Sequence, residues 1–471
     1  MKGRVRQQSS IAIFPRPIAA AGINSPTITN NQHHWPAHRA QSADGAGPDK
    51  RFPRGCGIDK ALSAYSHRGM AMKWRNQILA LICLLAFAAL GVLYFQNWVV
   101  QKPFGIILFI GEGLTAQRMA ATRVYIGGAD NPLAMDGLEF SARLRNHSAD
   151  FAVPDSGAAA SALATGMKVK NGTISIAESG SALRTILEIA HDEGRATGIV
   201  TDGALTNPTA AAFYAHAGNA KQPQELASAL IERDAVEIAL GGGAAEFNKE
   251  KLDQARIRVV HNLPELEQIT GGQQPRLLGL FAPNDLPFTD EVAARTEQPS
   301  LADMVRRAIE LLQVNRHGYV LVVDAHLMAS AAWQNLGERT LRETAELDRA
   351  VQVGRQYAGR NAAIIVCGDA AIGGMSVNGY PFRYDTGVAI LGLNSAGQPW
   401  VSWATGPNGG KGNTASPGAR DLSALEPAAI LSPSALNSIE DPIANATGLR
   451  MEKLRGTIDN TDVFALIRDA L

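Results

Sequence analysis

Nearly continuous apolar runs recur along the chain after residue 99, separated by segments with apolar residues at helical spacing. A strand that is buried on both faces of a sheet reads as such an uninterrupted run. The runs predict strands at 105–110, 196–201, 236–240, 319–323 and 362–367. Helices are predicted at 181–193, 223–233, 301–315 and 336–358. This alternation predicts an α/β domain with a mostly parallel central sheet and helices on both faces.

A different apolar run stands ahead of this domain. Residues 78–95 carry no charge and are long enough to cross a bilayer, with Lys73 and Arg75 before them and Trp98 after them. The pattern predicts a transmembrane segment over 72–98, which is either an anchor or a signal peptide; no small-x-small cleavage pattern follows it, which favours the anchor. The basic flank predicts an inner-membrane protein whose large domain is periplasmic or otherwise extracytoplasmic.

The segment 1–71 has no hydrophobic period and is rich in Pro, Gly, Ala, Asn and basic residues. Such a composition cannot form a core, so the segment is predicted to be a disordered leader or a wrongly assigned start of translation. The whole chain has a formal net charge of zero, but 32 basic and 41 acidic residues lie beyond residue 97. An acidic domain argues against nucleic acid as a partner.

The segment from Pro154 to Gly166 places Ser156 at the start of an Ala-rich helix that follows an extended stretch. Backbone N–H groups at a helix N-terminus favour an anion, so a phosphate attacked by the Ser156 hydroxyl would be partly stabilised by the chain. The same residues suit a plain helix cap made by Asp155 or Ser156. The motif by itself leaves a nucleophile and a structural cap open.

This segment resembles the nucleophile segment of the alkaline phosphatases. Six further segments resemble that family in the same order: 105–113, 199–201, 210–216, 238–243, 279–283 and 364–369. The resemblance extends over nearly all of 102–471 and implies the alkaline-phosphatase fold. Members of that family hydrolyse phosphomonoesters with two zinc ions and one magnesium ion. The resemblance therefore implies Ser156 as the catalytic nucleophile and Asp155 beside it in the substrate site, with a phosphate or phosphoester as ligand and a homodimer as a possible assembly.

The resemblance also implies that four residues of this chain are oxygen ligands of a metal ion. They are Glu112, where the family has aspartate, Thr209, Asp324, where the family has glutamate, and Asp369. Hard oxygen ligands suit magnesium. Glu112, Asp324 and Asp369 each follow a predicted strand, and the carboxyl ends of parallel strands meet at one edge of a sheet. This convergence predicts one shared site independently of the resemblance.

Several of the family's zinc ligands are missing at the matching positions, which hold Ala329, Trp333, Ala370 and Asn413. Zinc prefers nitrogen and sulfur donors, and a catalytic zinc needs three protein ligands. The sequence therefore predicts that the zinc sites are lost and that one hard ion such as Mg²⁺ remains. His326 shares a strand face with Asp324 and is a spare nitrogen donor.

The arginine that clamps phosphate in the family corresponds to Lys221, a candidate substrate contact that cannot form a bidentate fork. Two functional hypotheses follow. One is a membrane-anchored pseudophosphatase with a degraded metal site, inactive or strongly altered as a phosphomonoesterase. The other is an active phosphomonoester hydrolase that uses Ser156 and a reduced metal centre. The loss of several electrostatic contacts, each often contributing about 2.7–4 kcal/mol to transition-state binding, favours the first hypothesis.

Overall fold

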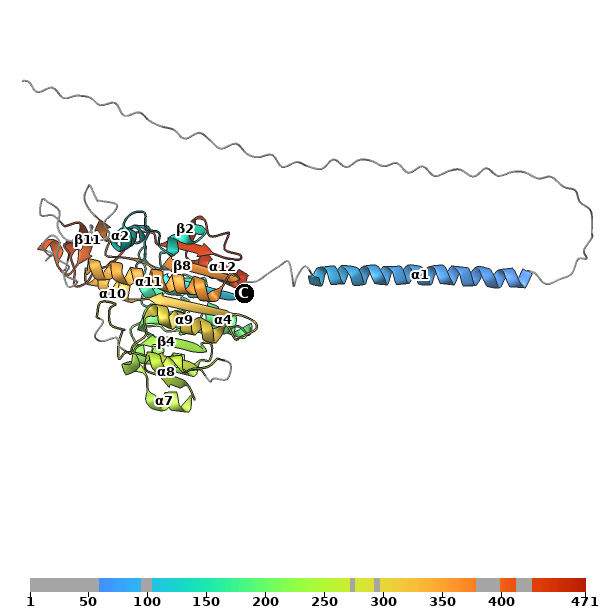
Figure 1. Cartoon of the computed structure of the whole chain (residues 1–471), viewed down its shortest axis with the longest axis horizontal. Coiled ribbons are helices and arrows are strands. Elements are labelled where there is room, and N and C mark those ends of the chain that lie inside the picture. The colour runs from blue at the N-terminus through green and yellow to red at the C-terminus, as the bar shows by residue number, and fades with distance from the viewer. Residues whose placement is uncertain (1–58, 95–103, 272–275, 292–296, 378–398, 412–425) are drawn as a thin grey trace, which may run out of the picture. The chain divides into compact units, whose positions relative to one another are not determined.

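A computed structural model of the protein describes residues 59–94, 104–271, 276–291, 297–377, 399–411 and 426–471 (Figure 1). The chain divides into two compact units, Met1–Leu85 and Ala86–Leu471. The first described element is one long helix, α1 (Asp59–Tyr94). The other described elements form the α/β domain, which begins with β1 (Gly105–Gly111).

The apolar part of α1 has the length and composition of a membrane span. Its stretch Trp74–Tyr94 has a mean hydropathy of 2.4, and none of it is buried. The helix begins at Asp59, ahead of the predicted boundary at 72, so residues 59–71 are helical rather than part of a disordered leader. The remainder of that predicted leader, residues 1–58, lies outside the described residues.

The domain is built on a ten-stranded sheet of order β15-β2-β14-β8-β1-β7-β3-β4-β6-β5. The strands besides β1 are β2 (Phe140–Arg145), β3 (Ala196–Ala204), β4 (Ile238–Gly242), β5 (Arg258–Val260), β6 (Leu277–Leu280), β7 (Tyr319–Ala325), β8 (Ala362–Gly368), β14 (Ile443–Thr447) and β15 (Gly456–Asp459). All neighbours from β8 to β5 are parallel, whereas β14 is antiparallel to β8 and β2. The predicted mostly parallel sheet is confirmed.

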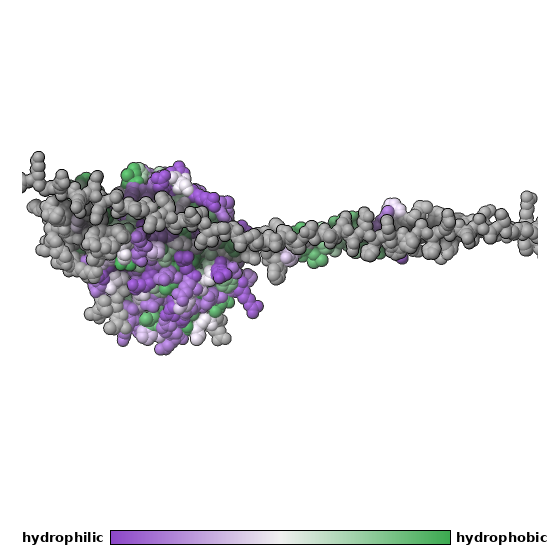
Figure 2. Space-filling model, turned by 45° about the horizontal axis from the view of Figure 1, so that its top comes forward, coloured by the Kyte–Doolittle hydropathy of each residue, from purple (hydrophilic) through white to green (hydrophobic). Residues whose placement is uncertain are grey.

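Helices cover both faces of this sheet, as predicted. In β1, Ile106, Leu108 and Ile110 belong to one apolar cluster, and Ile107 and Phe109 belong to another, because successive side chains of a strand point to opposite faces. The first cluster includes residues of α3 (Ser156–Thr165), α4 (Ile186–Asp192), α6 (Pro223–Glu232) and α12 (Thr461–Ala470). The second includes residues of α2 (Ala116–Gly127), α9 (Leu301–Leu312) and α11 (Gly337–Ala358). Mostly hydrophilic residues lie on the face of the domain shown in Figure 2.

The helix predicted at 181–193 is shorter in the structure. Helix α4 begins only after Thr185, whose side chain accepts a hydrogen bond from the Glu188 N–H while the Glu188 side chain accepts one from the Thr185 N–H. This capping box satisfies N–H groups that would otherwise lack a partner at a helix start. Residues 181–185 are therefore not helical.

The remaining described elements are short. The helices are α5 (Pro208–Ala211), α7 (Lys249–Gln254), α8 (Leu263–Glu267) and α10 (Leu327–Trp333). The strands are β9 (Ala371–Ile372), β10 (Ser376–Val377), β11 (Val401–Gly406), β12 (Ala428–Leu431) and β13 (Asn437–Ser438). Strands β10, β11 and β12 form a small sheet, and β13 pairs with β9.

Glu426 joins this small sheet to α11. Its Oε2 accepts hydrogen bonds from Trp403 Nε1 on β11 and from the Gly337 N–H at the start of α11, both at 2.8 Å. Burial of the carboxyl, helped by the neighbouring Glu338, raises the pKa of Glu426 to about 8 although the two hydrogen bonds oppose the shift. The folded protein therefore keeps a proton on Glu426 at neutral pH.

This proton makes folding stability depend on pH. A raised folded-state pKa contributes stability that is complete below the ordinary pKa of 4.5 and is lost as the pH rises through about 8. Between pH 5 and pH 9 the free energy of unfolding of the natural protein should fall by about 4 kcal/mol more than that of Glu426→Gln. Urea unfolding at both pH values measures this, with exposed Glu452→Gln as the control. An identical pH dependence in all three proteins would contradict the prediction.

Candidate functional site

Three acidic side chains lie at the carboxyl ends of three neighbouring strands. The pairing register of β1 with β7 and β8 brings the ends of these strands level with one another. Glu112 and Asp369 directly follow β1 and β8, and Asp324 is the penultimate residue of β7. Each of the three is at most 1% exposed. The fold thus gathers the predicted carboxylates at one edge of the sheet.

Each of these carboxylates has one oxygen in a hydrogen bond. Asp324 Oδ2 accepts from the Thr201 hydroxyl at 3.0 Å, and Asp369 Oδ1 accepts from the Gly113 N–H at 3.0 Å. Glu112 Oε1 lies 2.9 Å from His326 Nδ1. One half of each carboxylate is therefore held in place by the protein.

The other half of each carboxylate has no protein partner. Within the described ranges, Glu112 Oε2, Asp324 Oδ1 and Asp369 Oδ2 are buried oxygens without a hydrogen bond, and so is Thr209 Oγ1 on α5. A buried polar atom without a partner costs about 1–3 kcal/mol, and more when it is charged. The four residues that the sequence predicts as ion ligands thus all carry an unsatisfied oxygen.

The carboxylates also repel one another. Burial and the charge of Glu112 raise the pKa of Asp324 well above its ordinary value. The same two causes, in the same order, raise the pKa of Asp369 to about 7, against hydrogen bonds from the Ala370 and Gly113 backbone. The surrounding protein groups therefore do not offset all of the negative charge of these carboxylates.

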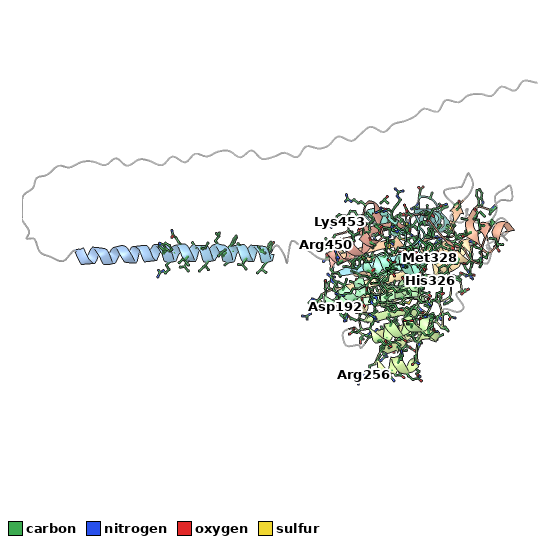
Figure 3. The ribbon with its side chains drawn as sticks, turned by 180° about the vertical axis from the view of Figure 1, so that it is seen from behind. Asp192, Arg256, His326, Met328, Arg450 and Lys453 are labelled. Atoms are coloured by element: carbon green, nitrogen blue, oxygen red, sulfur yellow. The ribbon has the colours of Figure 1, made fainter. Side chains whose placement is uncertain are left out.

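His326 connects two of the acidic groups in this region. Its Nδ1 contacts Glu112, and its Nε2 lies 3.5 Å from Asp285 Oδ2. Burial lowers the pKa of His326, but Glu112 and Asp285 outweigh it and raise that pKa well above its ordinary value. Figure 3 places His326 and Met328 within the body of the domain, whereas Arg256 lies at its edge. His326 is therefore an ion-pair partner inside the site.

Two further carboxylates of the site were missed by the sequence reasoning. Asp202 Oδ1 accepts from the backbone N–H groups of His326 at 2.7 Å and Leu327 at 3.0 Å, and burial raises the pKa of Asp202 to about 7. Burial would also raise the pKa of Asp285, but hydrogen bonds, the largest from His326, outweigh it and lower the pKa to about 2. Asp202 could have been predicted as a site residue, because it directly follows the strand predicted at 196–201. Asp285 lies in a loop, where the sequence shows no periodic pattern of apolar residues.

The helix cap at Ser156 is made by its neighbour. Asp155 is the N-cap of α3, where its Oδ1 accepts from the Ala158 N–H at 2.8 Å and its Oδ2 accepts from the Gly172 N–H at 2.5 Å. Ser156 is the first helical residue and is partly buried. Its hydroxyl makes no hydrogen bond to the described part of the chain. The structure therefore leaves the Ser156 hydroxyl available at the N-terminus of a helix.

Two contacts tie the Ser156 segment to the ligand region. The Pro154 carbonyl accepts from Asn437 Nδ2 at 2.8 Å, and Asn437 lies on β13, which pairs with β9 just after Asp369. On the other side, a Cβ added to Gly157 would lie 3.5 Å from the Cβ of Pro208, the residue before Thr209. The residues on either side of Ser156 thus approach β13 and the start of α5.

Lys221 lies apart from these groups on the exposed surface, and its backbone N–H donates to Asn219 Oδ1 at 2.9 Å. This backbone bond is the contact that the structure shows for Lys221 among the described residues, and it does not involve Ser156 or the carboxylates. A contact between Lys221 and a bound phosphate stays a prediction.

The positions that match missing zinc ligands are apolar in the structure. Ala329 is fully buried on α10, and Trp333 at the end of the same helix is partly buried. Both contact a cluster that comprises Ala121, Tyr125, Ala332, Leu341, Ile372, Met375, Val401, Trp403, Ala428 and Ala435. Ala370 is also fully buried, and Asn413 lies outside the described residues. Among the described residues, no group of three His, Cys, Asp or Glu side chains could hold a metal ion as they stand.

Comparison with known proteins gives the family. A family model described as alkaline phosphatase matches residues 105–400. Alkaline phosphatase 4 of Bacillus subtilis is 27% identical over 291 residues, covering 58% of this chain and 62% of that protein. Alkaline phosphatase H of Pseudomonas aeruginosa is 27% identical over 441 residues, covering 80% of this chain and 87% of that protein. This chain thus spans less than two-thirds of the Bacillus relative.

Solved structures share the fold. The alkaline phosphatase of Thermus thermophilus has a TM-score of 0.63 at 22% identity, covering 79% of this chain and 92% of that one. The alkaline phosphatase of the Antarctic bacterium TAB5 has a TM-score of 0.61 at 19% identity, covering 79% and 98%. With the family model matched across most of the α/β domain, the chain belongs to the alkaline phosphatase family.

Proposed function

We propose that the protein is a membrane-anchored, extracytoplasmic member of this family that binds one oxygen-ligated divalent ion and a phosphate or phosphomonoester, with strongly reduced hydrolytic activity. The observation that carries the proposal is the set of four unsatisfied buried oxygens on Glu112, Thr209, Asp324 and Asp369. They are the oxygen donors that Mg²⁺ or a similar hard ion prefers. Burial first and the charge of Glu112 second raise the pKa values of Asp324 and Asp369, and a divalent ion would offset both effects.

As they stand, the described carboxylates do not form a group that could hold an ion. Each has one oxygen in a hydrogen bond and one without a partner, so ion binding would require side-chain rearrangement that brings the unpartnered oxygens together. Asp324 Oδ2 and Asp369 Oδ1 would keep their bonds from Thr201 and the Gly113 N–H. A divalent ion bound there would supply Lewis-acid stabilisation of a phosphoryl oxygen.

The chain's own groups fit an anion beside that ion. Helix α3 has ten residues, and its first N–H groups and positive dipole end favour negative charge next to Ser156. Asp155 holds the helix start in place, so the Ser156 hydroxyl is free to face the anion. This arrangement supports phosphate binding, and it supports attack by Ser156 on phosphorus as the route of any remaining hydrolysis.

The apolar setting of Ala329 and Trp333 supports reduced activity. A zinc ion at these positions would have to enter an apolar cluster that offers no nitrogen or charged oxygen donor from either residue. Without a second ion, the leaving oxygen and the attacking oxygen cannot both be stabilised by metal. An active hydrolase with a reduced metal centre remains the second candidate, and the free Ser156 hydroxyl is the observation that favours it.

Ion content is the first test. The purified protein is expected to bind about one Mg²⁺ or Mn²⁺ per chain and little zinc, because the available ligands are hard oxygens. Asp324→Asn is expected to weaken Mn²⁺ binding about tenfold or more, since it removes one full charge from the site. Isothermal titration calorimetry and elemental analysis measure both quantities, with Asp192→Asn on the exposed surface as the control. About two zinc ions per chain after mild purification would refute the ion assignment.

The anchor is tested separately. We expect the full-length protein to stay with membranes after carbonate washing, because Trp74–Tyr94 is apolar and wholly exposed in the described chain. Protease added from outside the inner membrane should then digest the α/β domain, as expected from the basic residues Lys73 and Arg75 on the cytoplasmic side. A soluble protein whose N-terminus maps beyond Phe95 would show that the segment is a cleaved signal.

A further inference from the structure

A buried guanidinium lies at the base of the candidate ion site. Arg118, in the first turn of α2, is 2% exposed. Its Nη1 donates to the Glu112 carbonyl and its Nη2 donates to the Ile372 carbonyl, both at 3.3 Å. These two carbonyls belong to the backbone that carries Glu112 and to the strand that follows Asp369. Arg118 is therefore held between two of the proposed ligand segments.

The backbone is shaped to accept this side chain. Gly113 has a φ of +85°, and a Cβ added there would lie 2.3 Å from Arg118 Nη1. A side chain at this position would displace the guanidinium. The same Gly113 donates its N–H to Asp369 Oδ1 at 3.0 Å, so one glycine serves both the arginine and a proposed ligand.

Electrostatics indicate that the guanidinium acts on the carboxylates. Burial lowers the pKa of Arg118 to about 10, while the charges of Glu440 and Asp369 oppose the change. Arg118 thus remains positive at neutral pH. A buried charge needs opposite charge nearby, which Glu440 supplies first and Asp369 second, in addition to the partial charge of the two backbone carbonyls.

We propose that Arg118 is a permanent counter-charge of the ion site, which lowers the affinity of that site for a divalent ion. The inference rests on the proposed function of the same site. Glu112 and Asp369 carry negative charge when ionised, and the guanidinium held beside their backbone offsets part of that charge whether or not an ion is bound. Arg118 therefore acts as a positioning and charge-setting residue beside the ligands, without touching the substrate.

Three variants test this role by Mn²⁺ titration calorimetry of the full-length protein. Arg118→Gln removes the charge and is expected to tighten Mn²⁺ binding about tenfold or more, because a nearby positive charge opposes a cation. Arg118→Lys keeps the charge and is expected to bind Mn²⁺ within about threefold of the natural protein, even though it loses the paired carbonyl contacts. Arg123→Gln removes an equal charge from the same helix, where Arg123 pairs with Asp136 at 2.6 Å, and is expected to change nothing.

The outcomes separate this inference from the ion proposal. If the natural protein binds Mn²⁺ and Arg118→Gln binds it no more tightly, the counter-charge role is overturned and the ion proposal stands. Weaker binding by both Arg118→Gln and Arg118→Lys would assign a purely structural role, which also overturns it. If only Arg118→Gln binds Mn²⁺, the counter-charge role is supported and the ion proposal for the natural protein fails. If neither binds, both fail.

Discussion

Ser156→Ala is expected to remove phosphomonoester hydrolysis, which we expect in the natural protein to be orders of magnitude slower than in its relatives. Ser156 lies at the start of α3 and is the proposed nucleophile, and loss of a nucleophile commonly costs about three orders of magnitude or more in kcat. Initial rates with an aryl phosphate and acid-stable labelling of the protein by radioactive phosphate measure the two expected losses. The substitution should leave the fold intact, because Asp155 rather than Ser156 caps the helix.

Asp155 provides the matched comparison. Asp155→Ala removes the cap and the bond to the Gly172 N–H, so it should lower the free energy of unfolding by about 1 kcal/mol or more, which Ser156→Ala should not do. Rapid turnover by the natural protein, lost in Ser156→Ala, would reject the pseudophosphatase hypothesis and establish an active metal centre. Activity that persists in Ser156→Ala would exclude Ser156 as the nucleophile.

Ala329→Asp is expected to lower the free energy of unfolding by about 3–5 kcal/mol at neutral pH. Ala329 is fully buried and belongs to the same apolar cluster as Leu341, Ile372 and Trp403, so the new carboxylate would be a buried charge in an apolar setting. Urea unfolding monitored by tryptophan fluorescence measures the loss. The loss should shrink at pH 4, where the carboxyl can take up a proton.

Ala329→Asn separates size from charge in this experiment. The amide has the shape of the carboxylate without its charge, so Ala329→Asn should destabilise the fold less than Ala329→Asp at pH 7 and should show no gain at pH 4. Added zinc is expected to leave the stability of Ala329→Asp unchanged. Recovery of stability by zinc would show that the α10 region keeps a functional metal site, contrary to the proposed loss.

The central strands were predictable because a strand that is buried on both faces appears in the sequence as a continuous run of apolar residues. The run at 362–367 became β8 (Ala362–Gly368), and the run at 105–110 became β1. Strand β2 was missed because its burial alternates along the chain, so it has no continuous apolar run. Strand β14 was missed because its small residues, such as Ala444 and Ala446, give a weak signal even though both are fully buried.

Part of the candidate site was predictable for the same reason. Glu112, Asp324 and Asp369 follow apolar runs, and the carboxyl ends of parallel strands meet at one edge. Asp285 was not predictable because it lies in a loop that no periodic pattern marks, and Arg118 was not predictable although it lies on α2. Charged residues are usually exposed, so nothing in the sequence distinguished Arg118 as a buried one.

The sequence by itself determined the α/β class, the apolar helix ahead of the domain and the carboxylates at the strand ends, because periodicity and residue order are local properties of the chain. The tertiary structure decided which oxygens of those carboxylates are bonded and which are free, and it placed Ala329 in an apolar cluster and a guanidinium behind Glu112. These features arise from contacts between residues up to 256 positions apart, such as Gly113 and Asp369. Such contacts depend on the packing of distant segments, which local patterns do not encode.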